Sequence, residues 1–218
     1  MGKIHMIFNR ILFSISYRIN KLNRFLIKGS NNIVDKKKLI GCVLEIYGND
    51  NQIMIARNAK IMNTRIFIKG NHCRVILHES AFVKGGEIWL EDNNTEIHLG
   101  EKTTIESAHI AVCENNSKIS IGKECMFAHN VEIRTSDSHS ILDENGIRIN
   151  KAADVSIGNN VWLGSRTMVL KGVKIADNTI IGAGSIVTKN IETSNSLSVG
   201  SPACVVREKI TWKRERIN

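Results

Sequence analysis

Aliphatic residues recur every six positions between Ile157 and Glu192. An α-helix repeats its buried face about every 3.6 residues and a strand every 2, so neither element has this period. The first positions of the blocks are large and aliphatic: Ile157, Leu163, Val169, Ile175, Ile181 and Val187. The fifth positions are β-branched or small: Val161, Thr167, Val173, Thr179, Ser185 and Ile191. The pattern predicts one short strand in each block, with its first residue pointing inward.

The same spacing extends toward the N-terminus in a longer unit. Residues 51–138 divide into four segments of 22: 51–72, 73–94, 95–116 and 117–138. Three columns of apolar residues lie six apart in these segments, namely Ile55, Leu77, Leu99, Ile121; Ile61, Val83, Ile105, Phe127; and Phe67, Trp89, Ala111, Ile133. Residues 29–50 are predicted to form a fainter unit of the same kind, with Ile33 and Leu39 in register.

Three short strands per unit would wind the chain into a triangular coil. Each strand would then pair with its equivalent in the next coil, about 4.8 Å away. One coil cannot bury its inner face alone, which explains why the motif repeats. The unit ends supply residues that tolerate left-handed dihedrals: Gly70-Asn71-His72, Asp92-Asn93-Asn94 and Glu114-Asn115-Asn116. The repeat therefore predicts an all-β parallel β-helix, for which the general crossover rule would favour a right-handed coil.

Both ends of the chain differ from the repeat and carry most of its net charge of +9. Residues 1–28 contain basic but no acidic residues, and apolar residues recur there near helical spacing, which predicts a basic amphipathic helical segment. Two interpretations stay open for it: attachment to the inner membrane surface, or a cap on the open end of the coil. The sole proline, Pro202, marks the exit toward a short C-terminal helix in residues 208–218.

Composition places the protein inside the cell. The uncharged run from Ile11 to Tyr17 is too short to span a bilayer, and no cleavage site of a signal peptide follows it. The five cysteines are scattered and lack a C-x-x-C pair, so neither a disulfide framework nor a zinc ribbon is indicated. An apolar content of 42% is sufficient for a core. We expect a cytoplasmic protein, peripheral to the inner membrane if the N-terminal segment binds lipid.

The blocks "IGNNVW", "LGSRTM" and "IGAGSI" resemble those of the hexapeptide-repeat acyltransferases. The resemblance covers residues 51–207 and is most specific over 117–207. It implies a left-handed β-helix, here over 29–207, that assembles as a homotrimer with coenzyme A bound between subunits.

The largest break in the repeat is the insertion Asp137 to Asp154, which carries His139. Composition alone favours reading His139 as a solvent-exposed histidine without a task. However, "IRTSDSHSI" followed by "GNNVWLGS" resembles the catalytic-histidine loop of sugar and polysaccharide O-acetyltransferases, closest to those of capsule and O-antigen. The resemblance implies that His139 is a general base, which takes a proton from a hydroxyl as its oxygen attacks a thioester.

Further roles follow from the same resemblance. A backbone N–H near Gly164 or Ser165 would stabilise the oxyanion, and Asp137 or Asp143 would orient the imidazole unless each is a turn residue. Trp162 is expected to point outward and to form the acetyl and acceptor site, the alternative being packing over a neighbouring coil. The matched motifs imply coenzyme A contacts from Ser165, Ala183, Thr188, Lys189 and Arg207. Cys204 stands where the family often has a basic residue, and Lys189 and Arg207 could instead be ordinary surface charges.

The leading hypothesis is an acetyl-CoA-dependent O-acetyltransferase, without a metal or a nucleic-acid partner. Its acceptor would be a sugar hydroxyl of a bacterial surface polysaccharide or of a lipid-linked precursor. Alternatives are a small acceptor (a free sugar, an amino sugar, serine or an antibiotic) and a non-catalytic β-helix binding module. A hexapeptide-type zinc enzyme is disfavoured because none of the seven histidines forms an H-x4-H pair.

Overall fold

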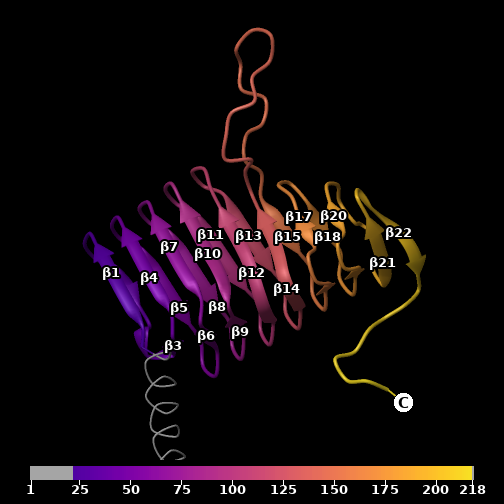
Figure 1. Ribbon diagram of the computed structural model, residues 1–218, viewed down its shortest axis with the longest axis horizontal. Helices are drawn as coiled ribbons and strands as arrows, with labels where there is room; N and C mark the ends of the chain where they lie inside the picture. The colour runs from indigo at the N-terminus through magenta and orange to yellow at the C-terminus, as the bar shows by residue number, and fades with distance from the viewer. Residues whose placement is uncertain (1–21, 218) are drawn as a thin grey trace, which may run out of the picture.

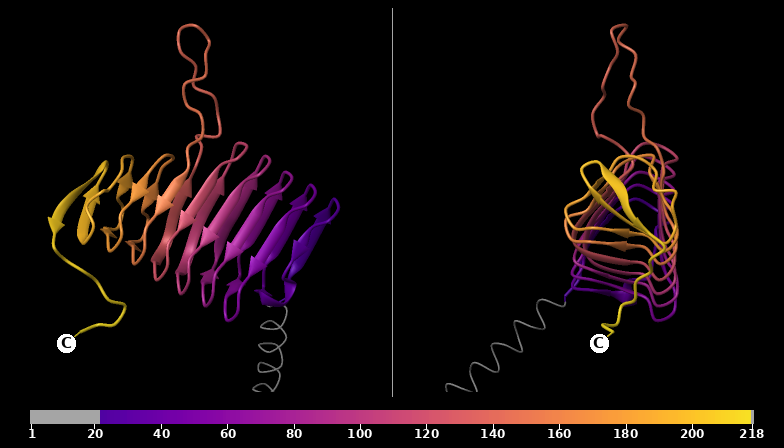
Figure 2. Two further views of the ribbon diagram at one scale, coloured as in Figure 1. Left: turned by 180° about the vertical axis from the view of Figure 1, so that it is seen from behind. Right: turned by 90° about the vertical axis from the view of Figure 1, so that its right-hand side faces the viewer.

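The computed structural model describes residues 22–217, which wind into a left-handed parallel β-helix (Figure 1). Seen along the stack, the coils have a triangular outline with one loop projecting from a corner (Figure 2). Aliphatic side chains from all three faces fill the interior. Among residues 22–217 the helical structure is one 3-10 turn, η1 (Lys36–Lys38), and no helix there is long and apolar enough to cross a bilayer. The predicted fold class is confirmed.

The first face is one parallel sheet in which the predicted column of inward residues is correct. The column runs from Ile55 through Leu77, Leu99 and Ile121, and continues in register to Ile157 and Ile175. Its strands are β2 (Ile33–Val34), β5 (Gln52–Ile55), β8 (Arg74–Leu77), β11 (Glu96–Leu99), β13 (Lys118–Ile121), β15 (Val155–Ile157) and β18 (Lys174–Ile175).

The second face also follows the prediction. Ile61, Val83, Ile105 and Phe127 pair in register, followed by Leu163 and Ile181. This face comprises β3 (Leu39–Ile40), β6 (Lys60–Met62), β9 (Phe82–Lys84), the first halves of β12 (Thr104–Val112) and β14 (Met126–Arg134), β16 (Trp162–Leu163), β19 (Ile180–Ile181) and β21 (Ser196–Gly200).

The third face departs from the predicted column. Phe67 and Trp89 point outward, because their neighbours Ile66, Ile68, Ile88 and Leu90 are the buried residues. Ile133 is nevertheless inward, since a register shift after Ser107 adds one residue to β14 and exchanges the two sides of that strand. The strands are β1 (Arg24–Lys28), β4 (Val43–Tyr47), β7 (Arg65–Lys69), β10 (Gly86–Glu91), the second halves of β12 and β14, β17 (Met168–Val169) and β20 (Ile186–Val187).

The corners between the third and first faces carry a ladder of asparagines. The side-chain oxygens of Asn71, Asn93 and Asn115 each accept the backbone N–H of the equivalent residue one coil earlier, at 2.9 Å. Residues beside the ladder adopt the expected left-handed conformation, with φ between 57° and 75° at His72, Asp92, Asn94, Glu114 and Asn116. The ladder satisfies backbone donors that the sharp turn would otherwise leave unpaired.

Residues 29–50 form a coil, but only one of its two predicted register positions is correct. Leu39 pairs with Ile61 as expected. Ile33 instead pairs with Gln52 and is 60% exposed, so that Val34, beside Ile53, lies nearer the core. The shorter offset arises because this coil spans 19 rather than 22 residues between β2 and β5.

The predicted C-terminal helix needs correction, and so does the end of the predicted N-terminal helical segment. Most of the basic segment 1–28 lies outside the described residues, but its end, Arg24–Lys28, is strand β1, which pairs in parallel with β4. The predicted C-terminal helix is absent from residues 208–217, where β22 (Ala203–Glu208) pairs antiparallel with β21 across the turn at Pro202 and an irregular tail follows. At each end the unpaired edge of the coil offers backbone partners, which favours a strand over a short exposed helix.

Candidate active site

The insertion of residues 137–154 projects as an ordered hairpin from the corner after β14 (Figure 1). Leu142 bridges Arg148, and the N–H of Ile149 donates to the carbonyl oxygen of Ile141 at 2.9 Å. The hairpin lies where the coil length changes: coils before it repeat every 22 residues and coils after it every 18. The loop that was predicted to hold the catalytic histidine is therefore a structured element.

Asn150 holds the base of this hairpin around His139. Its side chain is only 7% exposed, and its Nδ2 donates to the carbonyl oxygen of His139 and to Oδ2 of Asp137, both at 2.8 Å. Its Oδ1 accepts the N–H of Ile141 at 2.7 Å. The backbone on both sides of His139 is thus fixed, while the imidazole itself stays exposed. Sequence reasoning missed Asn150, because one asparagine in a polar insertion gives no sign of burial.

Glu114 joins the other strand of the hairpin to the coil. Its carboxylate accepts from the Arg148 guanidinium at 2.5 and 3.1 Å, from the Ser136 hydroxyl at 2.8 Å and from the N–H of Ala152 at 3.2 Å. Burial raises the pKa of Glu114, but these hydrogen bonds, led by Arg148, outweigh it and lower the pKa below its ordinary value. Glu114 is therefore ionised at neutral pH and bridges loop and coil.

The two aspartates proposed to orient His139 have other partners. Asp137 accepts Lys171 Nζ at 2.5 Å, and this hydrogen bond lowers the pKa of its carboxyl. Asp143 accepts the backbone N–H groups of Asn145 and Ile147 at 2.9 and 2.8 Å, which caps the turn at the hairpin tip. Both carboxylates thus stabilise the shape of the loop, which is the turn role that the sequence left open.

Trp162 points outward as expected and packs against the C-terminal tail. Its ring centroid lies 5.7 Å from that of Trp212, whose Nε1 donates to the carbonyl oxygen of Asn160 at 2.8 Å. Arg214 continues the contact by donating to Thr104 Oγ1 and to the carbonyl oxygen of Cys125, both at 2.7 Å. Sequence reasoning missed Trp212; a lone tryptophan in a basic tail was the available signal.

One of the two suggested oxyanion donors is unavailable. The N–H of Gly164 donates to the carbonyl oxygen of Ile181 at 2.8 Å as part of the coil pairing. The N–H of Ser165, by contrast, has no acceptor within residues 22–217. The prediction that the N–H of Gly164 stabilises the oxyanion is therefore wrong. The same role for the N–H of Ser165 stays a prediction.

The residues predicted to bind coenzyme A lie at two corners and on the last strand. Ser165 and Ala183 are equivalent residues of successive coils at the corner after β16 and β19. Thr188 and Lys189 follow β20, at the same corner as the hairpin but two coils later, and Lys189 is level with Lys171 of the coil between them. Arg207 is exposed on β22, opposite Leu197. One chain therefore does not bring these residues into a single pocket.

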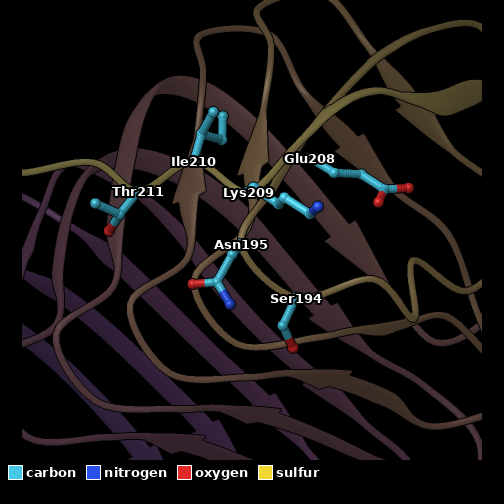
Figure 3. Close-up of a pocket in the computed structure, with 6 residues that line it drawn as sticks. All are labelled: Ser194, Asn195, Glu208, Lys209, Ile210 and Thr211. Atoms are coloured by element: carbon cyan, nitrogen blue, oxygen red, sulfur yellow. The ribbon is translucent and has the colours of Figure 1, made fainter.

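A shallow pocket lies where the tail leaves the coil, and it contains none of the predicted site residues (Figure 3). It is lined by Ser194, Asn195, Glu208, Lys209, Ile210 and Thr211. The N–H of Ile210 donates to the carbonyl oxygen of Asn195 at 3.0 Å and closes one side of it. Across residues 22–217, no three His, Cys, Asp or Glu side chains are grouped so that they could hold a metal ion.

The chain shares its repeat and its fold with known transferases. The family described as "Bacterial transferase hexapeptide (six repeats)" matches residues 154–189. A polysialic acid O-acetyltransferase of Neisseria meningitidis is 66% identical over 94 residues, which is 43% of this chain and 44% of the relative, so the match spans less than half of that protein.

Two solved structures extend the comparison. The polysialic acid O-acetyltransferase OatWY is 35% identical, with a TM-score of 0.83 over 90% of this chain and 93% of that one. A galactoside acetyltransferase in complex with coenzyme A is 26% identical, with a TM-score of 0.51 over 66% of this chain and 72% of that one. The repeat, the left-handed coil and this likeness over nearly the whole chain show that the protein belongs to the hexapeptide-repeat acyltransferase family.

Proposed function

We propose that the protein is an acetyl-CoA-dependent O-acetyltransferase that modifies a sugar hydroxyl of a sialic acid polymer or a similar surface polysaccharide. The observation that carries the proposal is the 35% identity to OatWY over 90% of this chain. The hairpin adds support, because an enzyme acting on a polymer needs its base on an exposed but fixed element. His139 has such a position.

His139 would act as the general base. In its neutral form the imidazole accepts the proton of the sugar hydroxyl while the oxygen attacks the thioester carbonyl carbon. The N–H of Ser165 would stabilise the negative charge on the carbonyl oxygen. As the carbon–sulfur bond breaks, the imidazolium returns the proton to the departing thiolate. The products are the acetyl ester and free coenzyme A.

We place the coenzyme A site between subunits of a homotrimer. Ser165 and Ala183 would line it from one corner, and Thr188, Lys189 and Arg207 would contribute from elsewhere on the assembled surface. The division of these residues between two corners of one chain supports a shared site. Exposed aliphatic side chains on the hairpin support assembly too, being 55% to 64% exposed at Ile141, Leu142, Ile147 and Ile149.

We also propose that the enzyme works in the cytoplasm at the inner membrane surface, where the basic residues 1–28 would meet anionic lipid. The N-terminal edge of the coil supports attachment or coverage there, since Leu22, Phe25 and Leu26 are exposed on it.

A thiol-release assay tests the activity. Wild type, His139→Ala and the control His78→Ala would be assayed with acetyl-CoA and polysialic acid, with coenzyme A binding measured in parallel. We expect His139→Ala to be at least about a hundredfold slower with unchanged coenzyme A binding, because a general base contributes about 10²- to 10⁴-fold. His78 is an equally exposed histidine away from the hairpin, and its loss should have no effect.

Other results would redirect the proposal. Release with a galactoside but not with polysialic acid would favour a small-acceptor enzyme. If wild type binds no coenzyme A, the acetyltransferase proposal is wrong and a binding module is the better description.

A further inference from the structure

A hollow on the third face opens beside the base of the hairpin. It is lined by Trp89, His109, Ala111, Cys113, Arg134 and Ser138, among others. A second hollow shares Cys113, Ser136 and Ser138 with it and continues to Arg148 of the hairpin. Because they share these residues, the two hollows form one groove along the coils to the segment that carries His139. We call it the third-face groove.

The groove exists because a column of aromatic side chains is interrupted. Phe67 and Trp89 pair in register on successive coils, and their ring centroids lie 4.0 Å apart. Tyr47, which is in register with Lys69, contacts Phe67 diagonally at 5.9 Å. The next residue of the column is Ala111, which pairs with Trp89. A methyl group cannot cover an indole, so the side of Trp89 facing Ala111 opens into the groove. This explains why the half-buried Trp89 lines a hollow where its stack with Phe67 ends.

Polar groups surround the indole. His109 Nδ1 lies 3.1 Å from Glu87, and Glu91 accepts Lys69 at 3.1 Å. Arg134 pairs with Glu132, but its Nε–H is buried and has no acceptor within residues 22–217. The groove thus sets an imidazole, carboxylates and a guanidinium beside the indole, which are groups that hydrogen-bond to hydroxyls.

The thiol that lines the groove is not poised as a nucleophile. Burial raises the pKa of the Cys113 thiol to about 11, so the thiol stays protonated at neutral pH. An aromatic face with nearby donors and acceptors, but without a thiolate, suits the binding of a polar ring compound. A pyranose ring fits this description, because its C–H side packs on an aromatic ring while its hydroxyls form hydrogen bonds.

We propose that the third-face groove is an acceptor subsite, in which Trp89 stacks on a sugar ring of the glycan chain whose neighbouring unit is acetylated. The inference rests on the proposed function. Ser138 lines the groove and precedes His139, so a chain bound along the groove is led to the base. A polymer would then be held by units that are not themselves modified, and short acceptors would gain less from the groove than long ones.

Three variants test the subsite with oligosialic acids of increasing length. Trp89→Ala removes the stacking ring, and Ala111→Phe would extend the aromatic column into the groove. Tyr47→Ala removes an aromatic on the same face that contacts Phe67 but does not line the groove, and it serves as the control. We expect the first two variants to raise KM about tenfold for long acceptors, an effect of the size of one aromatic contact, with KM for acetyl-CoA unchanged. Tyr47→Ala should match wild type.

Binding of the same oligosaccharides, measured by calorimetry without acetyl-CoA, separates the two proposals. Binding that needs Trp89 in a protein that transfers no acetyl group would support the subsite and contradict the proposed function. Transfer with an unchanged acceptor KM in Trp89→Ala and Ala111→Phe would overturn the subsite alone. An altered oligomeric state of Trp89→Ala in sedimentation, without weaker glycan binding, would also overturn it and identify this face as an interface between copies.

Discussion

Individual polar residues, rather than the core, decide how the hairpin presents His139. Asn150 makes three hydrogen bonds across the hairpin base from a buried position, and Glu114 collects donors from hairpin and coil. Buried polar groups are costly unless they are fully paired, so such residues hold one geometry and exclude others. The position of His139 therefore depends on side chains of the hairpin base and of the coil.

Asn150→Ala should lower kcat about tenfold or more without changing coenzyme A binding. The variant frees the carbonyl oxygen of His139 and the N–H of Ile141, so the imidazole loses its fixed position. Asn150 is a positioning residue in this proposal, and kinetics with a pH profile would check it. The pKa seen in the profile should stay that of wild type while the rate falls. Asn145→Ala, at the hairpin tip, is the control; an unchanged rate in Asn150→Ala would contradict the role.

The ion pair of Asp137 and Lys171 should make the stability of the hairpin base depend on acid pH. The pKa of Asp137 is lowered in the folded protein, so the pair stabilises above the ordinary carboxyl pKa of 3.8, and this contribution is lost as pH falls through the lower folded value. Its size is below about 1 kcal/mol because the carboxylate is 39% exposed. Thermal unfolding of wild type and Asp137→Asn from neutral pH to pH 3 measures it. The difference in Tm should be constant near neutrality and shrink in acid; a constant difference throughout would refute the assignment.

Elements in this protein are stabilised mainly by the coil above and the coil below. Each short strand has little structure of its own, and parallel pairing in register supplies its backbone partners. The corners must therefore stack as closely as the strands do. At the C-terminal end, β22 covers β21 in antiparallel pairing, so the tail rather than an exposed parallel edge forms the last layer.

Gly70→Ala should destabilise the fold by about 3 kcal/mol or more. A Cβ at Gly70 would lie 2.0 Å from the carbonyl oxygen of Asp92 in the next coil, so two corners would have to separate. Gly146, at the hairpin tip, is the matched control, because nothing lies within 4 Å of its added Cβ and its φ of 77° is the only strain. Gly146→Ala should cost about 1–2 kcal/mol locally. Chemical denaturation compares the two, and equal losses would show that corner stacking is not limiting.

The whole molecule is a rigid column with one arm, and its exposed apolar surface is concentrated at the arm and the N-terminal edge. The hairpin carries four exposed aliphatic side chains, whereas the coil between the N-terminal edge and the last strands exposes few, such as Met54. Large apolar groups gathered on a projecting element are typical of an interface. The predicted coenzyme A residues are divided between two corners of one chain. In the proposed trimer, a neighbouring subunit would supply the other side of the site.

Ile147→Ser combined with Ile149→Ser should dissociate the proposed trimer while the coil stays folded. Both side chains are on the hairpin and contribute nothing to the core, so far-UV circular dichroism should not change. Sedimentation velocity would show a shift from trimer to monomer, and activity should fall with it. Met54→Ser, an exposed apolar residue on the first face, is the control. A double variant that stays trimeric would exclude the hairpin as the main contact.

The sequence by itself determined the coil, two of its three buried columns, the asparagine corners and the place of the insertion. These features repeat along the chain, and a repeat is visible because inward residues must be apolar at every turn. The third column was misjudged at Phe67 and Trp89, since a one-residue shift reverses a strand and leaves composition unchanged.

Only the tertiary structure decided what meets across the repeat. The hydrogen bonds of Asn150 close the hairpin, and the bond of Glu114 to Arg148 and the packing of Trp212 on Trp162 join residues far apart in sequence. The gap at Ala111 likewise appears only when successive coils are stacked. The ends were decided in the same way, because β1 and β22 are strands only where a coil edge offers them partners. Local propensity determines neither these contacts nor the structure of the two ends. Both arise when coils stack, because a backbone hydrogen bond or a buried ring is stabilising only with the partner that the fold supplies.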